Sequence, residues 1–178
     1  MFDKNWHIKN TKRHCDAADL IRSDNLRKLE KKISRKQSVK STIVLSVVAT
    51  VCGMWRQSNP KTAENEKVYV LCGRAETKVD MIIRKNQLSK PEQDYCQRKL
   101  DDFFDRLKWT DGHEVDIGMG ITLAACLLES LPNKPELVGL GKILTEIMVN
   151  IERTDTDEDY LQYKAGLDAA AVWKEIVG

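Results

Sequence analysis

The chain contains few aromatic residues and few histidines, and it has no pair of cysteines with CxxC spacing. Phe, Trp and Tyr make up 6% of its 178 residues, whereas Asp, Glu, Lys and Arg make up 31%. A hydrophobic content of 42% is still sufficient for a real core, so this composition favours long helices with solvated faces. The length indicates one domain, or one domain preceded by an N-terminal extension.

Long apolar segments are also scarce. The N-terminus lacks an apolar stretch followed by small residues at a cleavage site, so we expect no secretory signal. The most apolar run, TIVLSVVATVCGMW at residues 42–55, would extend about 21 Å as a helix, short of the roughly 30 Å of a bilayer core. We expect a buried central helix here. A buried strand, which the many β-branched residues favour, and a membrane segment are the two alternatives.

Small and polar residues recur within this run at helical spacing. Thr42, Ser46, Thr50 and Gly53 follow one another at steps of four, four and three. On a helix they form one stripe, with large aliphatic side chains around the remaining faces. Such a stripe would allow a second helix to approach closely.

The five cysteines stand at positions 15, 52, 72, 96 and 126, which is an odd number without paired spacing. Three of them, at 52, 72 and 126, have apolar neighbours in the sequence. This pattern is typical of free, buried thiols in a reducing compartment and argues against a disulfide framework. We therefore expect a cytoplasmic protein.

No motif for catalysis, a metal or a cofactor is present. The chain has no GxxxxGK[ST] phosphate loop, and the glycine pairs at 118/120 and 139/141 lack the third glycine of a dinucleotide site. His7, His14 and Cys15 lack the second ligand pair of a zinc site, and the acidic residues at 155–159 lack the later positions of a calcium loop. We expect a protein that is not an enzyme and carries no cofactor or metal.

Charge is distributed unevenly along the chain. Residues 1–40 contain 12 basic and 5 acidic residues, a net charge of +7. Residues 41–178 contain the other 17 basic and 22 acidic residues, a net charge of −5. We predict a basic N-terminal arm at 1–40 and a helical domain at 41–178.

Within the arm, apolar residues recur near helical spacing from 16 to 37, with an interruption at 23–25 that can start a new helix. The opposite face is predicted to bind nucleic acid through six cations: Arg27, Lys28, Lys31, Lys32, Arg35 and Lys36. This face is rich in lysine and poor in side chains that read base edges, so contact with the backbone is expected, without sequence specificity. A solvated basic face without a ligand is the alternative.

Further helices are predicted along the domain. Asn59 and Pro60 suit the start of a helix over 60–86, although Val68 to Cys72 could instead form a short strand. Ser89 and Glu92 form a capping box for a helix to about 108. Helices over 114–131 and 135–151 should form an antiparallel hairpin, and a last helix is expected over 157–177. The packing side of the helix over 135–151 is predicted from steps of three and four residues: Leu137, Leu140, Leu144, Ile147 or Met148, and Ile151. The predicted fold is all-α, a single compact domain of about five or six helices.

These features lead to a hypothesis of a nucleic-acid-associated accessory protein of replication or regulation, of the kind that phages and mobile elements carry. The basic arm would contact phosphates, and the helical body would bind a protein partner. One alternative is a helical adaptor or inhibitor that binds only protein. Another is a membrane-associated protein that inserts residues 42–55, although a membrane is not the partner we expect. The sequence leaves the oligomeric state open.

Overall fold

The computed structural model of the protein describes residues 23–107, 117–132, 134–151, 171 and 174. The chain divides into two compact units, Met1–Lys36 and Gln37–Gly178. In the first unit, residues 23–34 are helical. The second unit contains helices α2 (Gln37–Ser58), α3 (Glu66–Lys85), α4 (Lys90–Leu107), α5 (Ile117–Glu129) and α6 (Pro135–Asn150). No strand occurs among the residues that the structure describes, which confirms the predicted all-α class.

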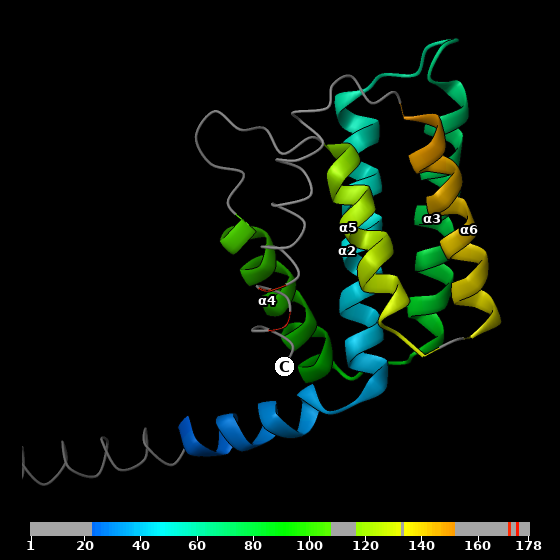
Figure 1. Ribbon diagram of the computed structural model, residues 1–178. Helices are drawn as coiled ribbons and strands as arrows, with labels where there is room; N and C mark the ends of the chain where they lie inside the picture. Colours follow the sequence, from blue (N-terminus) through cyan, green and yellow to red (C-terminus); the bar gives the residue numbers. More distant parts are fainter. Residues whose placement is uncertain (1–22, 108–116, 133, 152–170, 172–173, 175–178) are drawn as a thin grey trace, which may run out of the picture. The chain divides into compact units, whose positions relative to one another are not determined.

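Four helices of the second unit form an antiparallel bundle. Helix α2 contacts α3 and α5, and α6 contacts the same two helices from the other side (Figure 1). The four helices form a ring in the order α2, α3, α6 and α5, and each helix runs antiparallel to its two neighbours in this ring. Helix α4 lies outside the ring and contacts α2.

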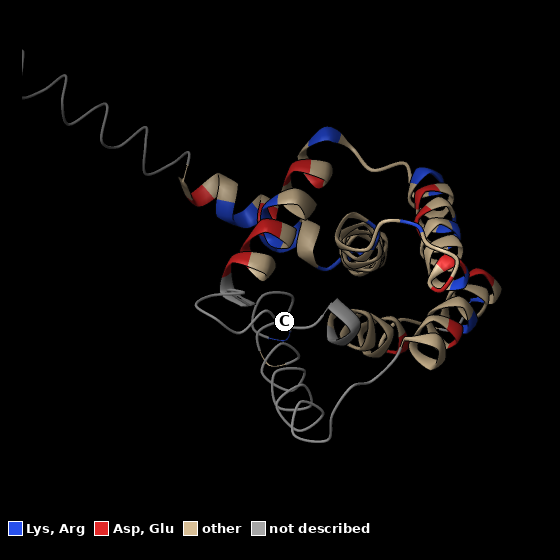
Figure 2. Ribbon diagram, turned by 90° about the horizontal axis from the view of Figure 1, so that it is seen from above, with Lys and Arg blue, Asp and Glu red and all other residues tan. Residues whose placement is uncertain are grey.

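Helix α2 is the central element of this unit because three other helices surround it. Its buried residues occur on all sides of the helix, which is expected for a helix that is apolar all round: Val39, Thr42, Ile43, Val44, Leu45, Val47, Val48, Val51, Cys52 and Trp55. Viewed along the bundle, α2 and α5 are almost free of charged residues, while α3, α4 and α6 carry charges (Figure 2). The predicted buried helix at 42–55 is therefore confirmed, and the alternative of a strand is wrong.

The helix is longer than the apolar run that predicted it. With 22 residues, α2 is the one described helix that is long and apolar enough to cross a membrane. Just over half of its most apolar window is buried inside the protein. Length alone therefore does not argue against a membrane segment, contrary to the prediction from 14 residues. The packing of α2 against three helices accounts for its apolar character.

The small-residue stripe of α2 contacts α3 at its two ends, Thr42 and Gly53. Each hydroxyl donates a hydrogen bond to the carbonyl oxygen four residues earlier in its own helix: Thr42 to Ser38, Ser46 to Thr42 and Thr50 to Ser46, at 2.7–2.8 Å. Asn86, at the end of α3, donates its Nδ2 to Thr42 Oγ1 at 2.9 Å. At the other end of the stripe, Gly53 lies against the carboxylate of Glu76. These contacts satisfy the hydroxyl groups, and the close approach of a second helix along the stripe stays a prediction.

The starts of α3 and α4 differ in how well the sequence predicted them. Helix α3 begins at Glu66, so the predicted start at Pro60 is wrong. The segment before it is held by mutual hydrogen bonds between Thr62 and Asn65, and Asn65 also donates to the Pro60 carbonyl. The capping box of α4 is present: the Ser89 N–H donates to Glu92, and the Glu92 N–H donates to Ser89 Oγ, both at 3.4 Å. The strand suggested at 68–72 is wrong, because those residues lie within α3.

Helices α5 and α6 form the predicted antiparallel hairpin. The inward face of α6 is the one that its spacing indicates: Leu137, Leu140, Leu144 and Ile147. Lys85 at the end of α3 pairs with Glu136 at the start of α6, with Nζ and Oε1 2.6 Å apart.

The predicted helix over 157–177 lies outside the described residues apart from positions 171 and 174. The predicted division at residue 40 stays a prediction, and residues 37–40 belong to α2.

Candidate nucleic-acid interface

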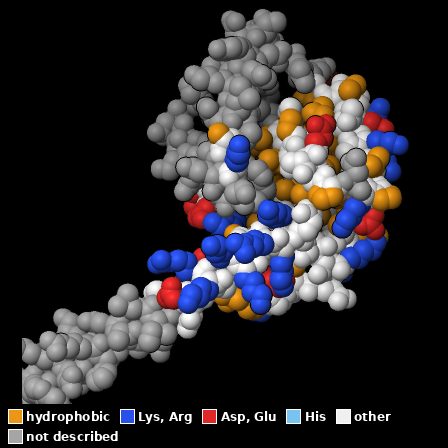
Figure 3. All heavy atoms as spheres, turned by 60° about the horizontal axis from the view of Figure 1, so that its bottom comes forward, with side chains coloured by type: hydrophobic (Ala, Val, Ile, Leu, Met, Phe, Trp, Pro, Cys, Tyr) orange, Lys and Arg blue, Asp and Glu red, His pale blue; other side chains and the backbone are white. Residues whose placement is uncertain are grey.

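The six cations predicted to bind nucleic acid lie on and just after the helix of the first unit. Arg27, Lys28, Lys31 and Lys32 belong to the helical residues 23–34, Arg35 stands in the turn that follows, and Lys36 comes next. The turn is closed by a hydrogen bond from the Lys36 N–H to the Ile33 carbonyl at 3.0 Å. All six residues are exposed. Figure 3 shows Lys and Arg side chains gathered along this segment.

Acidic residues neutralise only part of this charge. Residues 23–36 contain six basic and two acidic residues, Asp24 and Glu30, so the net charge is +4. Lys28 pairs with Asp24 one turn earlier, with Nζ and Oδ2 3.0 Å apart, and both side chains are more than half exposed. An exposed pair of this kind contributes little free energy and exchanges easily for another anion. Glu30 and Lys36 also have interaction partners.

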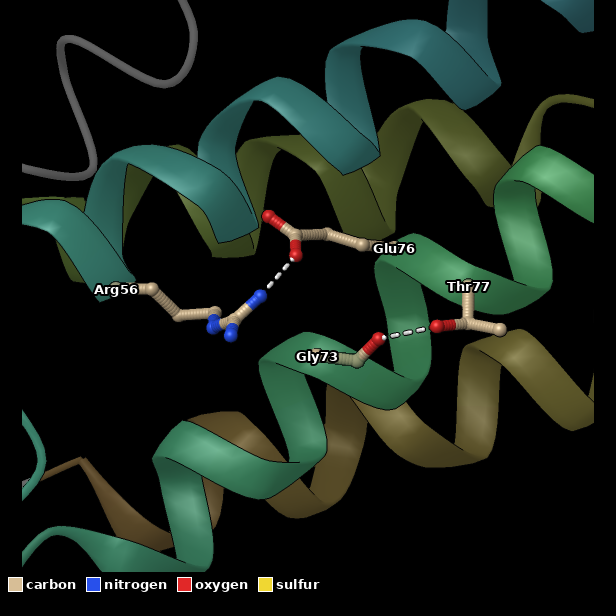
Figure 4. Close-up of polar contacts among 4 residues, drawn as sticks. All are labelled: Arg56, Gly73, Glu76 and Thr77. Atoms are coloured by element: carbon tan, nitrogen blue, oxygen red, sulfur yellow. Dashed lines mark hydrogen bonds and ion pairs between the residues drawn. The ribbon is translucent and has the colours of Figure 1, made fainter.

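A second polar cluster, which sequence reasoning missed, joins α2 to α3. Arg56 of α2 donates from Nη1 to Oε2 of Glu76 at 2.5 Å (Figure 4). Its guanidinium carbon also lies 4.7 Å from the centre of the Tyr69 ring, within the range of a cation–π interaction. The hydrogen bond that Arg56 donates to Glu76 and the contact with Tyr69 raise the pKa of Arg56 above its usual value.

Gly53 makes room for this cluster, and Gly73 lies beside it. A Cβ atom at Gly53 would lie 2.8 Å from Oε1 of Glu76, and one at Gly73 would lie 3.6 Å from the guanidinium carbon of Arg56. The Glu76 carboxylate thus occupies space that only glycine leaves open on α2. Both charged side chains are roughly one-third exposed, at 34% and 27%. The opposite charges neutralise each other, while the buried Nε of Arg56 has no hydrogen-bond partner among the described residues. We interpret this cluster as a structural link between α2 and α3.

Two buried thiols, Cys52 and Cys96, are shifted away from the reactive thiolate form. A hydrogen bond with Cys72, together with burial, raises the pKa of Cys52 far above the normal range. Burial also raises the pKa of Cys96 to about 11, and its Sγ lies 3.8 Å from the Val39 carbonyl oxygen. A nucleophilic cysteine needs the opposite shift, towards the thiolate. Cys126 was expected to be buried as well, but it is exposed, because it lies on the outward face of α5.

Other candidate sites receive no support in the described part of the chain. No group of three or more His, Cys, Asp or Glu side chains that could hold a metal ion occurs there. His7, His14, His113 and Cys15 lie outside the described residues. Comparisons with protein families, curated proteins and solved structures find no match for this chain. The functional conclusion therefore depends on its own residues.

Proposed function

We propose that the protein binds nucleic acid through the phosphate backbone, using the exposed cations of residues 27–36. The observation that supports this function is a net charge of +4 over the 14 residues 23–36, with six exposed cations on and beside one helix. Polyanions attract such a surface strongly, and phosphate contacts supply most of the affinity of non-specific binding.

The spacing of the cations suits a polyanion with closely spaced charges. Lys28 and Lys32 are four residues apart, which corresponds to about 6 Å along the helix axis. Double-stranded DNA presents one phosphate charge per about 1.7 Å of its axis, so three or four charges occur over that length. Several cations of this helix could therefore contact phosphates at once.

The residue types of the helix favour backbone contact over base recognition. Four of the six cations are lysines, which bind phosphate as point charges. Discrimination between bases usually depends on bidentate contacts from arginine, asparagine or glutamine inserted in the major groove. Binding is therefore expected to be independent of sequence. In this proposal the protein is a non-enzymatic accessory factor of replication or regulation, and the bundle of α2–α6 binds a protein partner.

Titration of a labelled duplex at 50 and 200 mM salt tests the proposal. With three or four phosphate contacts, the slope of log K against log salt should be about −3. A Lys28→Gln, Lys31→Gln, Lys32→Gln variant should bind more weakly and with a shallower slope. The matched control is Lys67→Gln, Arg74→Gln, Arg84→Gln, which removes three exposed cations from α3.

Two results would contradict nucleic-acid binding by the N-terminal helix. The first is the absence of binding at 50 mM salt. The second is an equal loss of affinity in the two triple variants, since that would show only an effect of total charge. A partner captured equally well from lysate with and without nuclease treatment would instead favour the alternative, a helical adaptor that binds only protein.

A further inference from the structure

The helix of residues 23–34 has an apolar side in addition to its cations. Leu26 is 53% exposed and Leu29 is 44% exposed. The two are three residues apart and therefore lie on the same side of the helix, whereas Ile33, four residues after Leu29 on that side, is buried. Scattered exposed leucines are ordinary, but two neighbouring leucines bordered by cations form an amphipathic surface.

We propose that this helix binds the surface of an anionic lipid bilayer. Leu26 and Leu29 would enter the boundary between head groups and acyl chains, and the cations would contact the anionic head groups. Helices that lie in this boundary combine a leucine-containing apolar face with a polar face rich in Lys and Arg. The inference depends on the two leucines and does not rest on the proposed binding of nucleic acid.

Charge complementarity favours a bilayer over a second copy of the chain. Two copies that met through Leu26 and Leu29 would bring two segments of net charge +4 together, and the charges would repel. An anionic leaflet offers the opposite charge and an apolar layer beneath it. Lys28 and Lys32 can lay their methylene stems along that layer while their ammonium groups remain at the head groups.

Both parts of the surface are needed for binding. Near an anionic leaflet each Lys or Arg strengthens binding about fivefold, and this contribution falls with salt. Burying one leucine side chain strengthens binding by roughly tenfold or more. A zwitterionic bilayer offers only the burial of leucine, and a phosphate backbone offers only the attraction of the cations.

Sedimentation of the full-length protein with vesicles tests the inference. Vesicles of phosphatidylcholine and phosphatidylserine should bind the protein, whereas vesicles of phosphatidylcholine alone should bind it at least tenfold more weakly. A Leu26→Ser, Leu29→Ser variant should lose at least tenfold in binding to the anionic vesicles. The matched control is Val138→Ser, Val149→Ser, which alters two exposed apolar residues of α6 and should bind as the parent does.

The same variants separate this inference from the proposed function. Leu26→Ser, Leu29→Ser should retain the affinity of the parent for a DNA duplex, whereas the triple lysine variant should weaken binding to both ligands. Circular dichroism identifies any variant that has lost helix, and Leu26→Ala, Leu29→Ala then replaces it, since alanine preserves helix propensity.

Three results would overturn the inference. They are no binding to anionic vesicles, equal binding to zwitterionic vesicles, and a leucine variant that binds vesicles as the parent does. Light scattering provides a further check. A parent dimer that the leucine substitutions convert to a monomer would show that a second copy of the chain covers this face.

Discussion

Arg56 of α2 and Glu76 of α3 form an ion pair across the helix interface, with Nη1 and Oε2 2.5 Å apart. The pair forms where Gly53 leaves the surface of α2 open, so the carboxylate lies directly against the helix. The ion pair, the contact of Arg56 with the Tyr69 ring and the packing at Gly53 thus lie at one place in the interface. This arrangement makes the α2–α3 interface the most informative part of the bundle for mutational tests.

Removal of either partner should destabilise the protein modestly. Since both side chains are about one-third exposed, solvent screens the pair, and we expect a coupling of about 1 kcal/mol. A double-mutant cycle with Arg56→Met and Glu76→Gln, followed by denaturant unfolding, measures this coupling. A coupling near zero would show that the two side chains act independently.

Alanine should have different effects at the two glycines. Gly73→Ala should stabilise α3 by about 0.5–1 kcal/mol, since its Cβ would make an ordinary contact with Arg56. Gly53→Ala should give no such gain, because its Cβ would displace the Glu76 carboxylate. In a Glu76→Ala background, Gly53→Ala and Gly73→Ala should have similar effects on stability. Equal stabilisation of the parent chain by both substitutions, measured by thermal unfolding, would contradict the close contact at Gly53.

Core and surface positions of α6 should differ strongly in their response to truncation. Leu144 is fully buried, so Leu144→Ala should lower the free energy of unfolding by about 2–5 kcal/mol. Val149 is 78% exposed, and Val149→Ala should change it by no more than about 0.5 kcal/mol. Urea titrations of the two variants give the comparison. Similar losses of stability in the two variants would contradict the burial of Leu144 and the exposure of Val149 on opposite sides of α6.

Stability should fall in alkaline solution, partly through Cys96. The pKa of its thiol is raised from 9.0 to about 11, so the folded chain keeps a proton that the unfolded chain releases. The contribution of this thiol is therefore fully present below pH 9 and is lost as the pH rises to about 11. Cys96→Ser, which does not titrate in this range, should reduce that fall by about 1–3 kcal/mol. Parallel pH profiles for parent and variant would argue against burial of this thiol.

Thiol reactivity should distinguish the cysteines of the bundle. Cys126 is exposed, whereas Cys52, Cys72 and Cys96 are buried. Brief treatment of the native protein with a maleimide, followed by peptide mass spectrometry, should therefore label Cys126 first. The other three should react at comparable rates only after denaturation. Rapid labelling of Cys72 in the native state would indicate that the α2–α3 interface opens easily.

The sequence by itself determined the helical class and several details of the bundle. Periodicity defined the inward face of α6, and the residue pair Ser89/Glu92 marked the start of α4, because both signals act over three to four residues. The six cations at residues 27–36 were also evident from the sequence alone. The small-residue stripe of α2 indicated a close helix neighbour without identifying which helix it would be.

Apart from the hairpin of α5 and α6, only the tertiary structure decided which elements meet. The pairing of Arg56 with Glu76, 20 residues later, depends on how α2 and α3 cross, and no local pattern encodes that crossing. The exposure of Cys126 likewise depends on which side of an almost wholly apolar helix faces its neighbours. Local propensities act within a few residues, whereas side-chain burial is a property of the assembled bundle. This physical difference explains why the helices and the hairpin of α5 and α6 were predictable, whereas the contacts between helices without a short link were not.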